Sequence, residues 1–299
     1  MSIPVEPLPH ESYAAFQVEP RPSASAIDPD DPPWGIGAAA FAWLSSVALL
    51  LMMQTLAVVP YAFLKYRPAK YPEIVAALAN DPNTIVLTII SVVPAHLLTL
   101  GVVWALVTQF GKRPFWPSLG WSFSKTFGLA EGAFFAALAL ALLVVGALLT
   151  FLLGGAKTPF DQMMESSTTA RFLTAFLATA TAPLIEELIY RGMLYPALKR
   201  AVGMFWSVVA VSTLFTFVHI AQYVNNYGVI TTITLLAFAL TYVRARTGRL
   251  LPCFIIHIVF NGVQVIALTA QYFLQHTKPD GATKAALLTL TTHVTGLRF

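Results

Sequence analysis

The chain has 299 residues, of which 57% are hydrophobic and only 11% are charged, and its mean hydropathy is +0.70. A soluble globular protein carries about 25% charged residues, so this composition excludes an ordinary soluble domain and predicts a polytopic membrane protein. The net charge of +4 does not indicate a nucleic-acid partner, because the basic residues lie in short clusters between apolar runs.

The first stretch, residues 1–35, is rich in proline and aspartate and contains no apolar core. Proline does not support a helix interior, so we expect a disordered cytosolic tail rather than a signal peptide. We interpret this tail as bacterial, which predicts the bacterial inner (plasma) membrane with the N-terminus in the cytoplasm. Lys and Arg at the helix ends favour this orientation by a margin of one residue.

Seven apolar stretches follow, most of them close to the ~20 residues that a helix needs to cross a bilayer. They predict an all-α, polytopic integral membrane helical bundle with seven transmembrane helices, or eight if the weakly apolar C-terminal tail also crosses. We expect N-terminal transmembrane helices over residues 36–160, a second helical bundle over 161–275 and a C-terminal tail over 276–299. The predicted spans are residues 37–62, 84–110, 127–153, 171–198, 205–222, 228–245 and 250–274.

The fourth predicted span contains two adjacent carboxylates, Glu186 and Glu187, and the guanidinium of Arg191. One charge at the bilayer centre costs roughly 2.5–3.5 kcal/mol, so such residues usually face a wet cavity and mark a functional site. Glu187 and Arg191 are four residues apart, share a helix face and can pair. Arginine keeps its proton and holds its partner ionised, which leaves Glu186 for acid–base chemistry.

Two later spans add polar side chains at helical spacing. Phe215 and His219 are four residues apart on one helix, and His257 and Asn261 are four residues apart on another. A glutamate with a histidine can activate a water molecule, and an imidazole with an amide can donate two hydrogen bonds to an oxyanion. The set therefore contains the groups needed to hydrolyse a peptide bond by direct attack of water.

These residues resemble the CPBP (CAAX protease and bacteriocin-processing, or Abi) family of intramembrane proteases over about residues 170–270. The resemblance implies that the bundle at 161–275 is catalytic and related to the Rce1-type enzymes, which remove the last three residues from prenylated CAAX proteins. It rests on three motifs in the same order: Glu186-Glu187-x-x-x-Arg191, Phe215-x-x-x-His219 and His257-x-x-x-Asn261.

The resemblance also implies a role for each polar residue of the motifs. The implied roles are activation of water by Glu186 with His219, an oxyanion site at His257 and Asn261, and support from Glu187 and Arg191.

The family further contains members described as immunity or scaffold proteins. A non-catalytic membrane scaffold or bacteriocin-immunity-type protein that binds a peptide in the same cavity is therefore the alternative. A proton-coupled transporter is a third hypothesis, but the sequence lacks the inverted repeat that would support it.

The use of a metal stays open at this point, because Glu186, His219 and His257 form a His₂Glu set, which is a known catalytic zinc pattern. We favour a glutamate-type endopeptidase without a cofactor, and a zinc metalloprotease is the alternative mechanism. The expected partners are the lipid bilayer and a membrane-associated peptide or protein substrate. His96 in the second span is interpreted as structural or pore-facing, and Glu131 in the third as interfacial.

Overall fold

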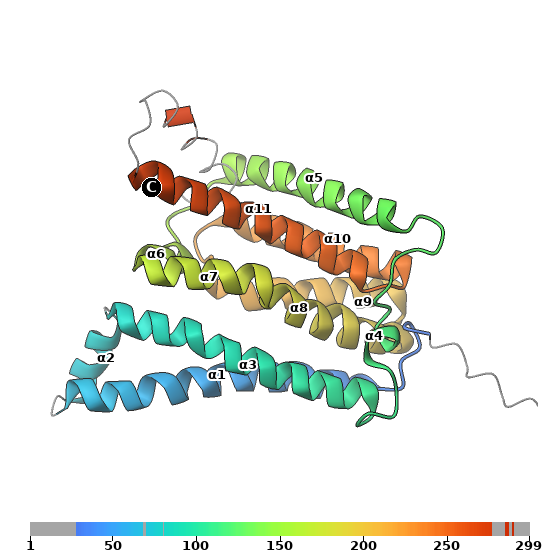
Figure 1. Ribbon diagram of the computed structural model, residues 1–299, viewed down its shortest axis with the longest axis horizontal. Coiled ribbons are helices and arrows are strands. Elements are labelled where there is room, and N and C mark those ends of the chain that lie inside the picture. Colours follow the sequence, from blue (N-terminus) through green and yellow to red (C-terminus); the bar gives the residue numbers. More distant parts are fainter. Residues whose placement is uncertain (1–27, 68–69, 80, 277–284, 287–288, 290–299) are drawn as a thin grey trace, which may run out of the picture.

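The computed structural model describes residues 28–67, 70–79, 81–276, 285–286 and 289, and the regular structure in these residues is helical (Figure 1). The predicted disorder of residues 1–27 and the eighth span in the C-terminal tail concern parts of the chain outside these residues. The helices are α1 (Ile36–Tyr66), α2 (Tyr71–Ala79), α3 (Pro82–Thr108), α4 (Phe115–Ser118), α5 (Leu129–Leu153), α6 (Pro159–Glu165), α7 (Thr168–Ala180), α8 (Ala182–Glu187), η1 (Leu188–Leu194), α9 (Tyr195–His219), η2 (Ile220–Gln222), α10 (Tyr227–Thr247) and α11 (Leu251–His276).

Side-chain caps mark several helix ends at residues that favour them. Asp81 accepts a hydrogen bond from the Asn83 N–H at the start of α3, and Thr158 and Asp161 form a reciprocal capping box at α6. Gly248 has a left-handed φ of 67° and ends α10. These caps place the helix ends within a few residues of the predicted span limits.

The fourth apolar run, Thr168–Gln222, is 55 residues long and is not one straight rod. Gly203 has φ 76° and ψ 172°, a conformation outside the helical region that glycine adopts at little cost. The rings of Tyr190 and Phe215 lie 5.1 Å apart, although the 25 residue steps from one to the other would separate them by about 37 Å in a straight helix. The chain therefore reverses direction at Gly203, and this run supplies two crossings.

Within the described residues, six helical runs are long and apolar enough to span a membrane. Because the fourth run reverses, these six runs correspond to the seven predicted spans. The predicted all-α membrane bundle is confirmed. Helices α1 and α3 form one layer, α7, α8 and α9 lie in the middle, and α10, α11 and α5 form the opposite side (Figure 1).

The largest apolar core surrounds the segment that carries the two glutamates. Leu188, Met193 and Tyr195 are completely buried, and they pack with Leu119 from the α4 region and Phe215 from α9. A closely packed core resists displacement of its side chains, so the site is built on a rigid part of the bundle.

Residues 28–35, the last part of the predicted tail, lie against the helices. Asp30 pairs with Arg244 and Lys199, and the Trp34 Nε1–H donates to the Met193 carbonyl over 3.2 Å. Burial of the indole and neutralisation of a buried guanidinium fix this stretch. The predicted disordered tail therefore does not extend over residues 28–35.

Candidate active site

The two glutamates lie at a change of helical register. Glu186 and Glu187 end α8, and the chain continues as a seven-residue π-helix, η1. Short π-helical segments are rare and frequently occur at functional sites. The Glu187 side chain is completely buried, whereas the Glu186 side chain is 25% exposed. Two neighbouring carboxylates therefore have different surroundings, as the sequence predicted.

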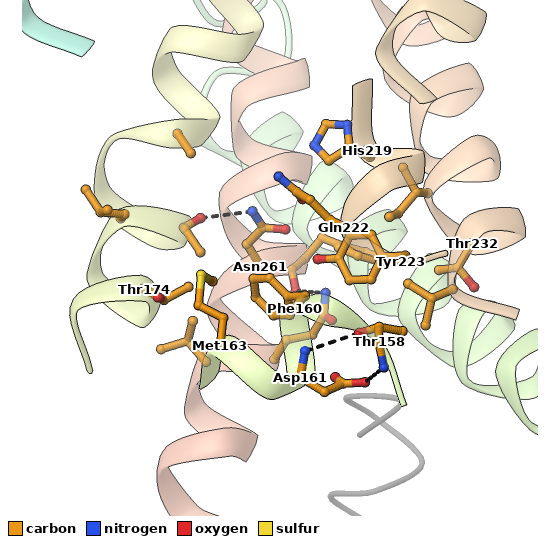
Figure 2. A pocket seen from close by; sticks show the side chains of 18 of the residues that line it. Thr158, Phe160, Asp161, Met163, Thr174, His219, Gln222, Tyr223, Thr232 and Asn261 are labelled. Atoms are coloured by element: carbon orange, nitrogen blue, oxygen red, sulfur yellow. Dashed lines mark hydrogen bonds between the residues drawn. The ribbon is translucent and has the colours of Figure 1, made fainter. Parts of the chain in front are cut away.

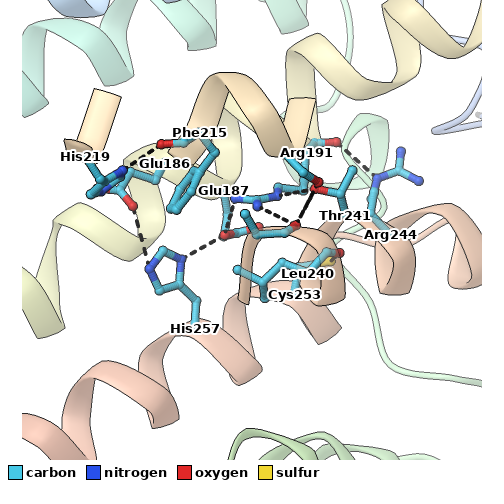
Figure 3. Close-up of polar contacts among 12 residues, drawn as sticks. Glu186, Glu187, Arg191, Phe215, His219, Leu240, Thr241, Arg244, Cys253 and His257 are labelled. Atoms are coloured by element: carbon cyan, nitrogen blue, oxygen red, sulfur yellow. Dashed lines mark hydrogen bonds and ion pairs between the residues drawn. The ribbon is translucent and has the colours of Figure 1, made fainter. Parts of the chain in front are cut away.

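Glu187 is held by two donors from separate helices (Figure 3). Its Oε1 accepts a hydrogen bond from Arg191 Nη1 at 3.1 Å and another from His257 Nδ1 at 2.8 Å. The predicted i,i+4 pair is thus present. Because a carboxylate only accepts, His257 Nδ1 carries a hydrogen, and this bond orients the imidazole ring of His257.

Arg191 makes further contacts through its other two guanidinium nitrogens. Nε donates to Thr241 Oγ1 over 3.2 Å, and Nη2 donates to the Ala237 carbonyl over 3.1 Å, both on α10. The guanidinium also lies 4.5 Å from the centre of the Phe215 ring, within the range of a cation–π interaction. Arg191 therefore ties the glutamate helix to α9 and α10.

Glu186 stands beside His257 without a direct hydrogen bond to it. The distance from Glu186 Oε2 to His257 Nε2 is 3.6 Å, which is longer than a direct hydrogen bond. The Arg191 guanidinium pairs with Glu187 and not with this carboxylate. Glu186 is consequently the glutamate that is available for chemistry.

His219 is fixed by its own helix and by an aromatic ring. Its Nδ1 lies 2.7 Å from the Phe215 carbonyl, and its ring stacks on the Phe215 ring with centroids 4.6 Å apart. A carbonyl only accepts, so Nδ1 is the protonated nitrogen in this geometry. Nε2 of a neutral His219 is then left as a hydrogen-bond acceptor.

One cavity of about 550 Å³ brings the predicted residues together. Glu186 from α8, His219 from α9, and His257 and Asn261 from α11 all line it. Figure 2 shows the part of its wall that includes His219 and Asn261. The Asn261 amide donates one hydrogen bond to the Ala178 carbonyl over 2.9 Å, and its second amide hydrogen remains for another acceptor. Most other lining side chains are apolar, and the volume is typical of ligand pockets.

The use of zinc stays a prediction. In the part of the chain that the structure describes, no group of three or more His, Cys, Asp and Glu side chains is found as a candidate metal site. Nδ1 of His257 and Nδ1 of His219 both face protein acceptors, so their Nε2 atoms are the ones that could bind a metal, as is usual for metal-binding histidines. Glu186 Oε2 lies 3.6 Å from Nε2 of His257.

Some residues of the site were not found from the sequence. Arg244 is completely buried and donates from Nε to the Arg191 carbonyl over 3.2 Å, although its sequence position suggested a helix-flanking charge. Thr241 bonds to the Arg191 guanidinium. The two residues are three positions apart on one face of an apolar helix, and this spacing is the signal that could have identified them.

Residues 168–263 match the model of the family described as type II CAAX prenyl endopeptidase Rce1-like. This segment is about a third of the chain and contains all three motifs, and the match confirms the resemblance. At the level of the family, it supports a CAAX-type intramembrane protease, and together with the long apolar helices it indicates an integral membrane protein. No curated protein and no solved structure matches the chain.

Proposed function

We propose that this Rce1-like chain is an intramembrane endopeptidase of the CAAX-processing type, which hydrolyses a peptide bond of a membrane-associated peptide or protein. One observation carries the proposal. The partly exposed Glu186 carboxylate and the His219 ring line the same largely apolar cavity, whereas Glu187 is buried and paired with Arg191. This arrangement supplies one free base inside the membrane and a fixed partner that keeps it in place.

The proposed reaction needs no covalent intermediate. Glu186 removes a proton from a water molecule that also donates a hydrogen bond to His219 Nε2. The water oxygen bonds to the carbonyl carbon of the substrate, and the carbonyl electron pair moves to its oxygen. When the C–N bond breaks, the proton on Glu186 passes to the departing nitrogen, so the products are a carboxylic acid and an amine.

His257 and Asn261 are the proposed oxyanion donors. In this role Nε2 of His257, whose Nδ1 is already bonded to Glu187, carries a hydrogen and lies 3.6 Å from Glu186 Oε2. His257 Nε2–H and the free amide hydrogen of Asn261 can then stabilise the negative oxygen.

The mechanism that we propose is of the glutamate type, without a metal. Its support is the partly exposed Glu186 carboxylate, which lines one cavity with His219 and can act as the base for water without a Lewis acid. The zinc alternative makes a different prediction. Stoichiometric zinc in the purified protein, lost together with activity on chelation and restored together with it, would replace the metal-free mechanism.

The test compares the wild type with Glu186→Gln and His219→Ala on a quenched fluorescent peptide in detergent or vesicles. We expect each variant to lose at least about 100-fold in kcat, the usual contribution of a general base. Glu73→Gln is the matched control, because Glu73 is an exposed carboxylate on α2, away from the cavity. Unchanged cleavage in the two site variants would refute the roles of Glu186 and His219, whereas binding of the peptide without cleavage by the wild type would favour a peptide-binding scaffold.

A further inference from the structure

A second cavity of about 180 Å³ reaches the same catalytic groups from another side. Glu186 and His219 line both cavities. Both cavities border α1 and α3. The 550 Å³ cavity extends from there among α5, α6, α7, α10 and α11, whereas the second cavity is enclosed by α1, α3, α8, η1 and the end of α9 (Figure 1). Glu186 and His219, together with Gln222, therefore lie on the wall that the two cavities share.

The second cavity is richer in polar groups than the first in proportion to its size. Its wall includes hydroxyl groups from α1, α3 and η1, an imidazole from α3 and an amide from η2. Such groups can give a water molecule the two to four hydrogen bonds that it needs. The polar lining residues besides Glu186 and His219 are Ser46, His96, Thr99, Tyr190 and Gln222.

His96 is the residue of this wall with the most specific geometry. It is 9% exposed, and its Nδ1 lies 2.9 Å from the Thr181 hydroxyl, at the junction of α7 and α8. Among the described residues, the hydrogen bond that the structure shows for the His96 ring is this one at Nδ1. The imidazole is thus fixed at one nitrogen and keeps the other for a molecule in the cavity.

Tyr190 supplies a second group of this kind. Its hydroxyl oxygen accepts a hydrogen bond from the Trp43 indole N–H over 3.0 Å. The hydroxyl hydrogen is not used in that bond, so it can donate to a water molecule in the cavity. His96 and Tyr190 thus offer a water molecule two fixed partners near Glu186.

We propose that the second cavity holds the water that the peptidase consumes, and that His96 is a positioning residue for that water. The inference rests on the proposed function. A substrate that fills the apolar 550 Å³ cavity displaces water from it, yet hydrolysis consumes one water molecule in each cycle. The second cavity far exceeds the ~10–15 Å³ that one water molecule requires, and it delivers water to Glu186 away from the substrate.

The first test asks whether this space is wet, independently of activity. Ser46→Cys places a thiol in the second cavity. Ser45→Cys is the matched control, because the neighbouring Ser45 lines neither the 550 Å³ cavity nor the second cavity. The unsubstituted protein reports the background, because its one cysteine, Cys253, is buried. We expect a small water-soluble methanethiosulfonate to label the Ser46→Cys variant at least about tenfold faster. Equal or absent labelling would overturn the proposal.

The second test is kinetic. His96→Leu removes both ring nitrogens, and Ser46→Leu fills the cavity. We expect each to lower kcat by about three- to tenfold, the value of one hydrogen bond, with KM little changed. His96→Gln should recover part of kcat, and Ser45→Leu should resemble the wild type. Thermal unfolding of each variant identifies any that fails to fold, and for such a variant the labelling result decides.

The outcomes separate the two proposals. If Glu186→Gln abolishes cleavage while His96→Leu and Ser46→Leu keep the wild-type kcat, the result supports the protease and refutes the supply of water through the second cavity. A higher KM with unchanged kcat would also overturn the water cavity, because it would assign this space to the substrate. If Glu186→Gln cleaves normally, the proposed glutamate mechanism is refuted, whatever the labelling of Ser46→Cys reports.

Discussion

Replacement of Asp30 by asparagine tests how the segment 28–35 supports the site. Arg244 is completely buried and donates hydrogen bonds to three acceptors, which are the Asp30 carboxylate, the Pro29 carbonyl at 2.9 Å and the Arg191 carbonyl at 3.2 Å. Asp30→Asn keeps the size of the side chain but removes the charge that neutralises Arg244. Because the Arg191 carbonyl belongs to η1, the change reaches the helix that carries the glutamates.

The expected loss of stability follows from the burial of the pair. Removing one partner of a buried ion pair costs about 3–5 kcal/mol, because the other charge stays buried and unpaired. The Asp30 side chain is 21% exposed, so solvent screens part of this energy, and we expect about 2–3 kcal/mol. For a protein of this size, the corresponding fall in the unfolding midpoint is roughly 3–5 °C.

The pH dependence supplies a second check. Burial alone would raise the pKa of Asp30, but Arg244 and Lys199 outweigh it and leave this pKa below the ordinary value of 3.8. A carboxylate whose pKa is lowered by folding contributes its full stabilisation above pH 3.8 and loses it as the pH falls through the folded pKa. The stability difference between the wild type and Asp30→Asn should therefore be constant near neutral pH and shrink in acid.

Unfolding in detergent, followed by circular dichroism, measures both effects. Asp31→Asn is the control, because the Asp31 side chain is 72% exposed and its pairing with Arg200 is worth at most about 1 kcal/mol. If Asp30→Asn were as stable as Asp31→Asn, or if its deficit did not change in acid, the buried Arg244 would not depend on Asp30.

Three further changes test other parts of the structure. Glu187→Gln should lower stability by about 3–5 kcal/mol in denaturant unfolding, because it leaves the buried Arg191 unpaired, whereas Glu186→Gln should unfold close to the wild type. Gly228→Ala should cost about 1–3 kcal/mol in the same assay, since its Cβ would lie 2.5 Å from the Thr150 Cα. Asp81→Asn should lower the thermal midpoint, because Asp81 caps α3 and the Lys65 ammonium and nearby tyrosine hydroxyls hold its pKa well below the usual range; the wild type should lose this advantage in strong acid.

The sequence predicted those features that depend on local spacing. Apolar length identified the spans, and four-residue spacing identified the Glu187–Arg191 pair. The structure brings Glu186, His219, His257 and Asn261 to one cavity, as expected, while their catalytic roles stay a prediction. The boundary between the fourth and fifth predicted spans was recognised from composition, and the reversal at Gly203 explains it.

Features that depend on distant parts of the chain were not predictable in this way. The contact between Arg244 and Asp30 joins residues 214 positions apart, and the bond between His96 and Thr181 joins residues 85 positions apart. No periodicity in one segment reports such pairings. Read singly, Arg244 was a helix-flanking charge and Asp30 part of a tail, because the sequence shows neither the partner nor the burial.

The different surroundings of the two adjacent glutamates explain why the site contains both. A lone carboxylate in the membrane could lower its energy by moving to the nearest cation, which would remove it from the reaction. Here Glu187 occupies the Arg191 guanidinium and Nδ1 of His257. Glu186 points about 100° away around the helix, lies 3.6 Å from Nε2 of His257 and reaches both cavities. On this reasoning, the buried Glu187 preserves the basicity and the position of the exposed Glu186. A site with Glu187 alone would keep its ion pair but lack a base, and a site with Glu186 alone would lose that carboxylate to the nearest cation.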